Sequence, residues 1–350
     1  MTTDRAGSSQ RPTRLNKTQW LILLGFNLLL LLILCYGFEY YLGLTSPQRK
    51  LPPQPSEITN SYGFREREFA VPKPPHTCRL MVLGDSFTWG KGVWQEERYT
   101  TLLEGHLQAA YPEKHFEVLN FGFPGAPTTR ERDSLAQYKD KVEPDLILLG
   151  FVLNDPQTNR QNYSVEREQF EQKYGQQIDE FLEDVEKWGL EHTAELSRQA
   201  LDSFIVRVGW VPAWQVALQR SYESDSFDWV RFEQALRDIK SMSDEMDLPQ
   251  PIFAVLNQGT YTDRPTNYYA PDEELQLYLG WYRQAEETAA LLGFNPINFA
   301  QPFADELAGE IMAANLLDGH PSPAMHAIYA RELFALIEDY VQVGLLCEEK

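Results

Sequence analysis

Residues 78–90 read CRLMVLGDSFTWG, an apolar run that ends at Gly84 and passes directly into small and polar side chains. A short continuous apolar run that stops at a glycine is typical of a strand that is buried on both faces of a parallel sheet. Asp85 and Ser86 then follow the carboxyl end of this strand. Ligands of doubly wound α/β sheets lie at that edge, so the stretch predicts both the sheet and the place of its chemistry.

Similar apolar runs alternate with helical patterns along the rest of the chain. Strand–helix alternation of this kind predicts a parallel sheet with helices on both faces. The further strands are expected at residues 116–121 (FEVLNF), 145–151 (DLILLGF), 252–256 (IFAVL) and 296–299, and the helices at 95–111, 129–142, 272–292 and 323–345.

One long stretch, residues 157–250, is acidic and helical and interrupts this alternation. Its apolar residues follow a 3.6-residue period, and residues 204–214 (FIVRVGWVPAW) are unusually apolar. Two interpretations stay open. The stretch either adds core to the domain, or it forms a helical cap whose apolar segment shapes a substrate pocket or touches a membrane.

Composition excludes several classes of protein. Apolar residues make up 43% of the 350 residues, which is enough to bury a core and excludes wholesale disorder. The formal charge of −20 disfavours binding to nucleic acid, because an acidic surface repels phosphate backbones. Three cysteines do not make a disulfide scaffold. Neither H-E-x-x-H nor C-x-x-C occurs, so we expect no metal site and no cofactor.

Residues 20–38 (WLILLGFNLLLLLILCYGF) carry no charged side chain. Nineteen helical residues span about 28 Å, close to the ~30 Å hydrocarbon core of a bilayer, and aromatic residues flank both ends. A transmembrane helix is therefore expected over residues 20–42. The alternative is a cleaved signal peptide, which usually has a shorter apolar region and small residues at its cleavage site.

The charges around this segment predict its orientation. The tail of residues 1–19 has four basic residues and one acidic residue, which favours a cytoplasmic location. Residues 43–57 contain four prolines and are expected to be a linker. The domain that follows, residues 58–350 with the helical insertion at 157–250, is then extracytoplasmic, at the periplasmic side or the cell surface.

Four sequence blocks stand where the expected strands end or near the C-terminus. They are GDSFTWG (84–90), NFGFPG (120–125), GFVLND (150–155) and DGHPSP (318–323). Together they supply a serine, a histidine, an acid and loops with amide donors, which are the groups that acyl transfer needs. The first block is not a phosphate-binding loop, because Gly92 stands where a magnesium-binding hydroxyl is required. The G-x-S-x-G elbow of common α/β-hydrolases is also absent.

The four blocks, in this order, resemble those of the SGNH or GDSL hydrolases. This resemblance implies a flavodoxin-like, doubly wound, five-stranded parallel sheet. It implies Ser86 as the nucleophile, His320 as the general base and Asp318 as the residue that orients His320. The backbone N–H groups of Ser86 and Gly125 and the side-chain amide of Asn154 would form the oxyanion hole. The expected reaction is hydrolysis of a carboxylic ester, with a small acyl ester, an acylated glycan or a lipid as substrate.

Two departures from the family pattern bear on these assignments. The chain has D-x-H where many members have D-x-x-H, and three residues separate Gly150 from Asn154 where one is common. Two other functions stay open: an O-acyltransferase that acts on a cell-envelope polysaccharide, and a catalytically silent scaffold of the same fold. The Asp–His pair follows the serine block, as in the hydrolases, whereas related acetyltransferases tend to place it before that block.

A disulfide between Cys78 and Cys347 is also predicted, since Cys35 lies in the membrane segment. Cys78 begins the first strand, at the edge opposite the catalytic loops. The last helix leaves the catalytic edge and extends about 33 Å over residues 323–345, which carries Cys347 to the edge where Cys78 lies. Disulfides persist in an extracytoplasmic compartment.

Overall fold

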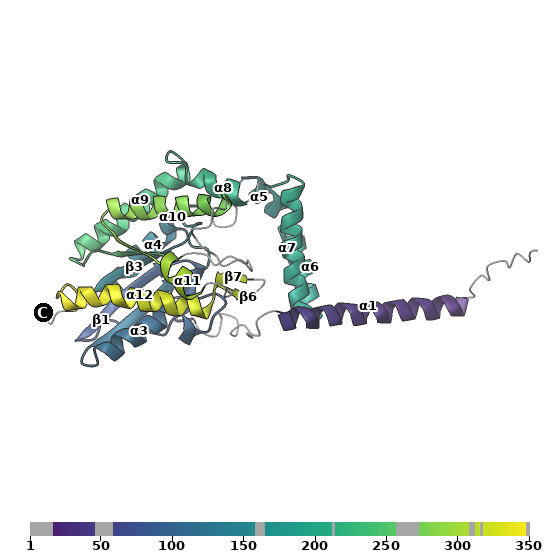
Figure 1. The fold of residues 1–350 in the computed structure, drawn as a ribbon, viewed down its shortest axis with the longest axis horizontal. Helices are drawn as coiled ribbons and strands as arrows, with labels where there is room; N and C mark the ends of the chain where they lie inside the picture. The colour runs from purple at the N-terminus through teal and green to yellow at the C-terminus, as the bar shows by residue number, and fades with distance from the viewer. Residues whose placement is uncertain are drawn as a thin grey trace, which may run out of the picture.

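The computed structural model describes residues 17–45, 59–157, 165–211, 214–256, 273–307, 312–315 and 318–347. A five-stranded sheet lies at its centre (Figure 1). All neighbouring strands of this sheet are parallel, in the order β2-β1-β3-β4-β5. The strands are β1 (Thr77–Gly84), β2 (His115–Gly122), β3 (Leu146–Phe151), β4 (Ile252–Val255) and β5 (Asn295–Asn298). The predicted doubly wound, flavodoxin-like sheet is thus confirmed.

Helices cover both faces of the sheet because its strands are apolar on both sides. In β1, Leu80 and Val82 are buried in one core and Met81 and Leu83 in the other. The first core is covered by α3 (Tyr99–Ala110), α11 (Ala300–Glu306) and α12 (Pro323–Gln342). The second is covered by α4 (Thr128–Val142), α9 (Phe227–Glu245) and α10 (Glu273–Leu291) (Figure 1).

The long helical stretch between β3 and β4 consists of two different parts. The helices are α5 (Val165–Phe170), a π-helical turn (Glu171–Gly175), α6 (Gln176–Lys187), α7 (Glu191–Arg207), α8 (Trp214–Ser221) and α9. Trp229, Phe232 and Leu236 of α9 are buried against the sheet, so this helix belongs to the central layers. In contrast, α6 and α7 form a hairpin with a small core of its own, made by Leu182, Val185 and Ala194.

Two elements differ from the sequence prediction. The expected helix at 95–111 is divided into a 3₁₀ turn (Gln95–Glu97) and α3, because Arg98 between them has an extended backbone. An antiparallel pair, β6 (Ala313–Asn315) and β7 (Asp318–Pro321), was not predicted. Strands this short have no periodicity that a sequence pattern reveals.

An apolar helix, α1 (Lys17–Thr45), projects from the domain (Figure 1). Its segment Trp20–Gly43 has a mean hydropathy of 2.5 and is 24 residues long, and none of its side chains that the structure describes is buried in the protein. This segment is long and apolar enough to cross a membrane. A signal sequence near the N-terminus has the same length and composition, so the helix is a candidate for either role.

Cys78 and Cys347 lie at the edge of the sheet where β1 begins. Their Cα atoms are 5.5 Å apart, within the range that a disulfide requires, and the structure joins the two residues. The bond links residues 269 positions apart and ties the end of the chain to the first strand. Among the described residues, Cys35 in α1 is the remaining cysteine and is free.

Three glycines at the carboxyl ends of β1, β2 and β3 form the seat of a short helix, α2 (Ser86–Trp89). Gly84 pairs in register with both Gly122 and Gly150. A Cβ atom on Gly84 would lie 2.0 Å from Thr88 Oγ1, and one on Gly150 would lie 2.6 Å from the same atom. A Cβ atom on Gly122 would lie 2.4 Å from the backbone nitrogen of Trp89. Helix α2 therefore lies so close to the sheet that a side chain at any of these three positions would collide with it. We call Gly84, Gly122 and Gly150 the glycine seat.

The glycine seat predicts that Gly150→Ala destabilises the domain. The new methyl group would meet Thr88, Leu256 and Tyr99, and such overpacking costs about 1–3 kcal/mol of the free energy of unfolding. Gly105→Ala is the control, because nothing lies within 4 Å of a Cβ on this helical glycine. That change should stabilise α3 by about 0.5–1 kcal/mol. Chemical denaturation measures both; equal effects of the two substitutions would contradict the seat.

A thiol count tests the disulfide. We expect one reactive thiol, that of Cys35, in the unreduced and denatured full-length chain, and three after reduction. Three thiols before reduction would show that Cys78 and Cys347 are unbonded in the protein.

Candidate active site

Ser86 stands at the start of α2, immediately after β1. Asp85 is the N-cap of this helix, and its Oδ1 accepts a hydrogen bond of 2.8 Å from the Phe87 N–H. Short polar residues favour this position because their side chains satisfy the free N–H groups of a helix start. Asp85 therefore holds the loop at the start of α2.

The structure brings Ser86 and His320 together, although they are 234 residues apart in the chain. Ser86 Oγ lies 2.8 Å from Nε2 of His320 and 3.2 Å from Oδ2 of Asp85. A serine hydroxyl has one proton and donates it to one acceptor at a time. The shorter contact favours His320, provided that the proton of its neutral ring is on Nδ1. This is the arrangement in which a histidine removes a proton from a serine.

The elements on either side of His320 fix its place. His320 lies in β7, which pairs with β6, and its ring centroid is 5.4 Å from that of Phe87. Two residues later, Ser322 caps α12 by accepting a hydrogen bond from the Met325 N–H, and Pro323 stands in the first turn. Proline at this place and serine at the N-cap are strong signals for the start of a helix. The histidine is thus held between a strand pair and a well-defined helix start.

Asp318 is the remaining member of the predicted triad. Its backbone lies in β7 and pairs with Asn315. Its side chain lies outside the part of the chain that the structure describes. The role of Asp318 in orienting His320 therefore stays a prediction.

The predicted oxyanion donors lie in the loops that follow β2 and β3. Gly125 is in a turn closed by a 2.9 Å hydrogen bond from the Ala126 N–H to the Phe123 carbonyl, with a φ of +63° that suits glycine. The Phe123 N–H donates to the carbonyl of Gly84, which joins this turn to the end of β1.

The loop with Asn154 is joined to the Gly125 loop in turn. The Thr128 N–H donates to the Asp155 carbonyl at 3.1 Å, and Asp155 Oδ2 accepts the Val152 N–H at 2.9 Å. Asn154 itself is half-buried. Hydrogen bonds therefore connect all three loops, and the strand register places their starts at one edge of the sheet.

Sequence reasoning assigned no role to Asn120, although it begins one of the four blocks. Its side-chain amide donates to the Thr88 carbonyl at 2.5 Å and to Thr100 Oγ1 at 3.1 Å, and its Oδ1 accepts the Gly122 N–H at 2.9 Å. Asn120 thereby attaches the last turn of α2 to β2. Only its place in the block NFGFPG signalled this role.

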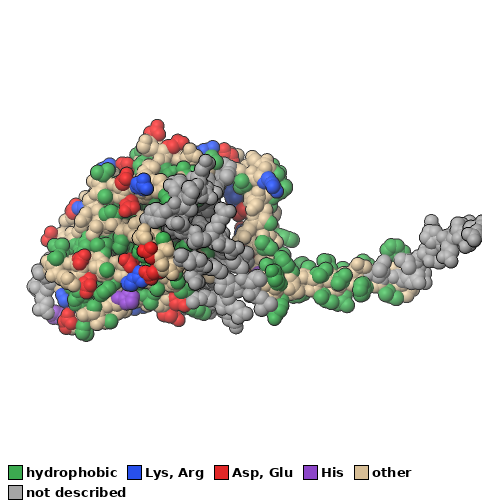
Figure 2. All heavy atoms as spheres, in the orientation of Figure 1, with side chains coloured by type: hydrophobic (Ala, Val, Ile, Leu, Met, Phe, Trp, Pro, Cys, Tyr) green, Lys and Arg blue, Asp and Glu red, His purple; other side chains and the backbone are tan. Residues whose placement is uncertain are grey.

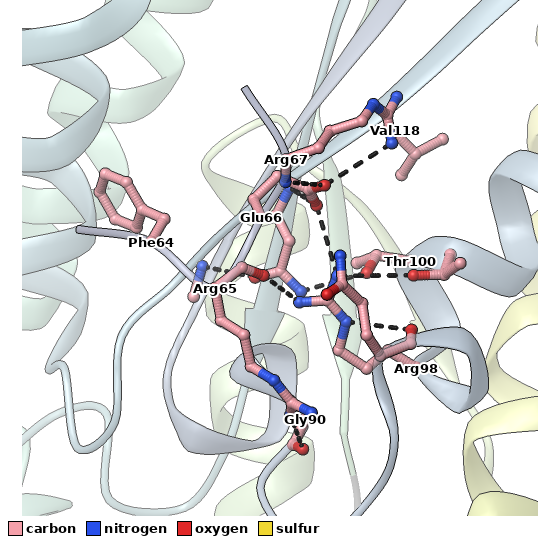
Figure 3. Close-up of polar contacts among 12 residues, drawn as sticks. Phe64, Arg65, Glu66, Arg67, Gly90, Arg98, Thr100 and Val118 are labelled. Atoms are coloured by element: carbon pink, nitrogen blue, oxygen red, sulfur yellow. Dashed lines mark hydrogen bonds and ion pairs between the residues drawn. The ribbon is translucent and has the colours of Figure 1, made fainter. Parts of the chain in front are cut away.

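A buried polar network also holds the far end of α2 (Figure 3). The guanidinium of Arg65 donates to the carbonyls of Gly90, at 2.6 Å, and Val93, at 2.9 Å. Arg98 in turn donates to the backbone carbonyl of Arg65 and forms an ion pair with Glu66. Residues 60–69 (NSYGFREREF) therefore fix the loop that follows α2.

Three buried acids lie close to one another beneath the loops. Asp85, Glu131 and Asp155 are each at most 2% exposed. Burial raises the pKa of Glu131 well above its ordinary value, and the neighbouring Asp85 adds to the effect. Burial, Glu131 and Asp85 raise the pKa of Asp155 in the same direction. Folding therefore favours the protonated form of these carboxyl groups. The cluster contacts the loop that carries Asn154, because Asp155 belongs to that loop.

The described residues include one group of three potential metal ligands with atoms within 4.8 Å of one another: Cys78, Asp145 and Cys347. The two cysteines are bonded to each other, and the carboxylate of Asp145 accepts hydrogen bonds from Lys73 and from the Arg79 N–H. This group lies at the amino end of β1, away from Ser86.

In this structure a serine follows the first strand of a flavodoxin-like sheet and contacts a histidine that lies just before the last helix. Residues 82–328 match the model of the GDSL-like lipase/acylhydrolase family. The chain belongs to this family, and it is an ester-hydrolysing enzyme.

The chain is also similar to solved structures of other proteins. LAE5, an α/β hydrolase from the metagenome of Lake Arreo in Spain, is 16% identical with a TM-score of 0.42, covering 76% of this chain and 95% of its own. Axe2, an acetylxylan esterase from Geobacillus stearothermophilus, is 17% identical with a TM-score of 0.41, covering 74% and 93%. The acetyl xylan esterase AlAXEase is 12% identical with a TM-score of 0.41, covering 74% and 99%. The search of curated proteins gives no match.

The buried acids predict a pH dependence of stability. Above the ordinary pKa of 4.5, the unfolded state loses the Glu131 proton while the folded state keeps it, so stability falls as pH rises toward the raised pKa. Below 4.5 both states are protonated, and the stability is fully present. Glu131→Gln should flatten this fall, because a neutral amide has no proton to lose.

The measurement is the denaturation midpoint of wild type and variant at a series of pH values from about pH 4 to about pH 9. This range includes the pH values at which a carboxyl group with a raised pKa loses its proton. Glu113→Gln, a change on the exposed surface, is the control and should leave the slope unaltered. Parallel pH profiles of wild type and Glu131→Gln would show that Glu131 is ionised in the folded protein.

Proposed function

We propose that this chain is a membrane-anchored serine esterase that hydrolyses carboxylic esters, O-acetyl esters among them, through an acyl-Ser86 intermediate. The observation that carries the proposal is the 2.8 Å contact between Ser86 Oγ and His320 Nε2 at the carboxyl edge of the sheet. Serine is a poor nucleophile unless an adjacent base takes its proton.

In the first step, Ser86 Oγ attacks the ester carbonyl carbon while its proton passes to His320 Nε2. The resulting imidazolium gives this proton to the alcohol oxygen as the C–O bond breaks, which leaves the acyl group on Ser86. Water then attacks the acyl-enzyme, with His320 again as base, and the acid is released. Asp318 would orient His320 through both steps and stabilise the imidazolium.

The negative charge that develops on the carbonyl oxygen needs fixed donors. We assign this role to the N–H groups of Ser86 and Gly125 and to the side-chain amide of Asn154. The hydrogen bonds between the three loops support the assignment, since they keep these donors from moving independently. One such donor typically contributes about 10²–10³ in rate.

The proposed location follows from α1. We infer that α1 crosses the membrane once, with residues 1–19 in the cytoplasm and the catalytic domain on the extracytoplasmic side. The length and hydropathy of this helix support the crossing. The basic residues that precede it support the orientation.

Ser86→Ala tests the mechanism. Loss of the nucleophile should lower the turnover of a chromogenic acetyl ester on the order of 10³-fold or more, without a change in the thermal midpoint. His320→Ala should cost a similar factor, because members of a triad act as a unit. Asp318→Asn should cost less if the short D-x-H spacing weakens its contact with His320.

The control is Ser241→Ala on α9, where the serine hydroxyl contacts Glu245 on the surface and no effect on turnover is expected. Retention of a tenth of wild-type turnover by a folded Ser86→Ala protein would rule out the acyl-serine route. Assays with an added glycan acceptor separate hydrolysis from transfer: release of free acid supports the esterase, whereas acylation of the acceptor would replace it with an acyltransferase.

A further inference from the structure

The α6–α7 hairpin exposes large aromatic side chains. Phe181 is 63% exposed and Trp188 is 67% exposed. They are seven residues apart, nearly two turns, so they share one face of the helix. On α7 and just after it, Phe204 and Trp210 are 53% and 56% exposed, and their rings lie 6.2 Å apart. We call these four residues the aromatic edge.

Acidic residues occupy most of the exposed surface of α6, and one of them, Asp184, lies about 60° from Phe181 and pairs with Lys187. Asp179, Glu183 and Glu186 are exposed, and their helical positions lie about 140–200° around the helix from Phe181. The helix thus has a charged side for water, a buried side against α7 and an aromatic side with no partner among the described residues. Exposed apolar groups on this scale mark a surface that binds another apolar surface.

The tip of the hairpin is attached to α1. The Tyr36 hydroxyl donates a 3.0 Å hydrogen bond to the carbonyl of Trp188. The carboxylate of Glu39 accepts the N–H groups of His192 and Thr193, each at 2.8 Å. Glu39 therefore caps α7 from another element, at a helix start whose own N-cap residue, Leu190, supplies no side-chain bond.

This attachment sets the depth of the hairpin relative to a bilayer. From Trp20 to Glu39 the helix rises about 28 Å, nearly the ~30 Å thickness of the hydrocarbon core. Glu39 and the hairpin tip then lie at the boundary between hydrocarbon and headgroups, where tryptophan and tyrosine concentrate. The hairpin runs across the direction of α1 (Figure 1), and hydrophobic side chains gather along its edge on the side of the projecting helix (Figure 2).

We propose that the α6–α7 hairpin lies flat on the membrane that α1 crosses, with its aromatic edge inserted into the headgroup region of the lipids. The occupant of this surface is a lipid bilayer, because the aromatic edge continues directly from a membrane-spanning helix. An amphipathic helix in this orientation binds through the apolar area that it buries in the interface. The inference rests on the membrane anchoring in the proposed function.

Spin labels on the full-length chain in phosphatidylcholine nanodiscs test the proposal. One label is placed at Phe181→Cys and a second, as the matched control, at Glu183→Cys on the acidic side, both with Cys35→Ser. A third label on the native Cys35 of the otherwise unchanged chain reports on α1. Collision rates with oxygen, which is enriched in lipid, and with a nickel chelate, which is confined to water, are measured for each site.

We expect high oxygen and low nickel accessibility at position 181, the reverse at position 183, and a several-fold difference in their ratio. If position 181 resembles position 183 while the Cys35 label is in lipid, the hairpin proposal is wrong and the anchor stands. Low accessibility to both reagents at position 181 means that protein covers it, for example a second copy, and also overturns the proposal. A Cys35 label exposed to water would overturn both the hairpin proposal and the proposed membrane anchor. Ester hydrolysis is measured separately and tests the proposed enzymatic activity. Circular dichroism of each labelled protein checks that the fold is unchanged.

Discussion

The approach of α2 to the ends of β1, β2 and β3 is the constraint on which the rest of the site depends. The glycine seat allows a helix of four residues to lie directly on the sheet, at distances where a single methyl group would collide with Thr88 or Trp89. A helix this short has little stability of its own. It persists because the sheet, Asn120 and the Arg65 network bind it on several sides. Ser86 is therefore positioned by the whole sheet edge and not by its own loop.

The same packing explains why so many polar groups are buried near the site. Arg98 is fully buried, and Arg65 and Glu66 are each about 4% exposed, as expected only where charged groups have partners. The two arginines donate to backbone carbonyls, and Glu66 pairs with Arg98 and accepts the backbone N–H groups of Arg67 and Asn120. The charged groups therefore hold irregular backbone in place and attach it to β2. Asp85, Glu131 and Asp155 differ, because burial raises the pKa of each and favours the protonated form.

The sheet could be predicted from the sequence because each strand is a continuous apolar run that ends in a distinct motif. The meeting of Ser86 and His320 at one edge of the sheet could be predicted for the same reason, since the motifs mark the carboxyl edge. The Arg65–Arg98 network could not, because its residues come from a segment without hydrophobic periodicity and their contacts span tens of residues. The division of the helical stretch was also hidden: α6 and α9 have similar periodicity, and only tertiary packing distinguishes a core helix from a helix of the hairpin.

The bond between Cys78 and Cys347 changes what a single cut in the chain can do. Every residue of the proposed active site lies between these two cysteines, and the first cysteine follows α1 in the sequence. After one cleavage anywhere inside this loop, the fragment with His320 would still be covalently attached to the fragment with α1. Under the proposed anchoring by α1, a protease could thus open the domain without releasing it from the membrane. Shedding would require a cut before Cys78, or a second cut together with loss of the noncovalent contacts in the sheet.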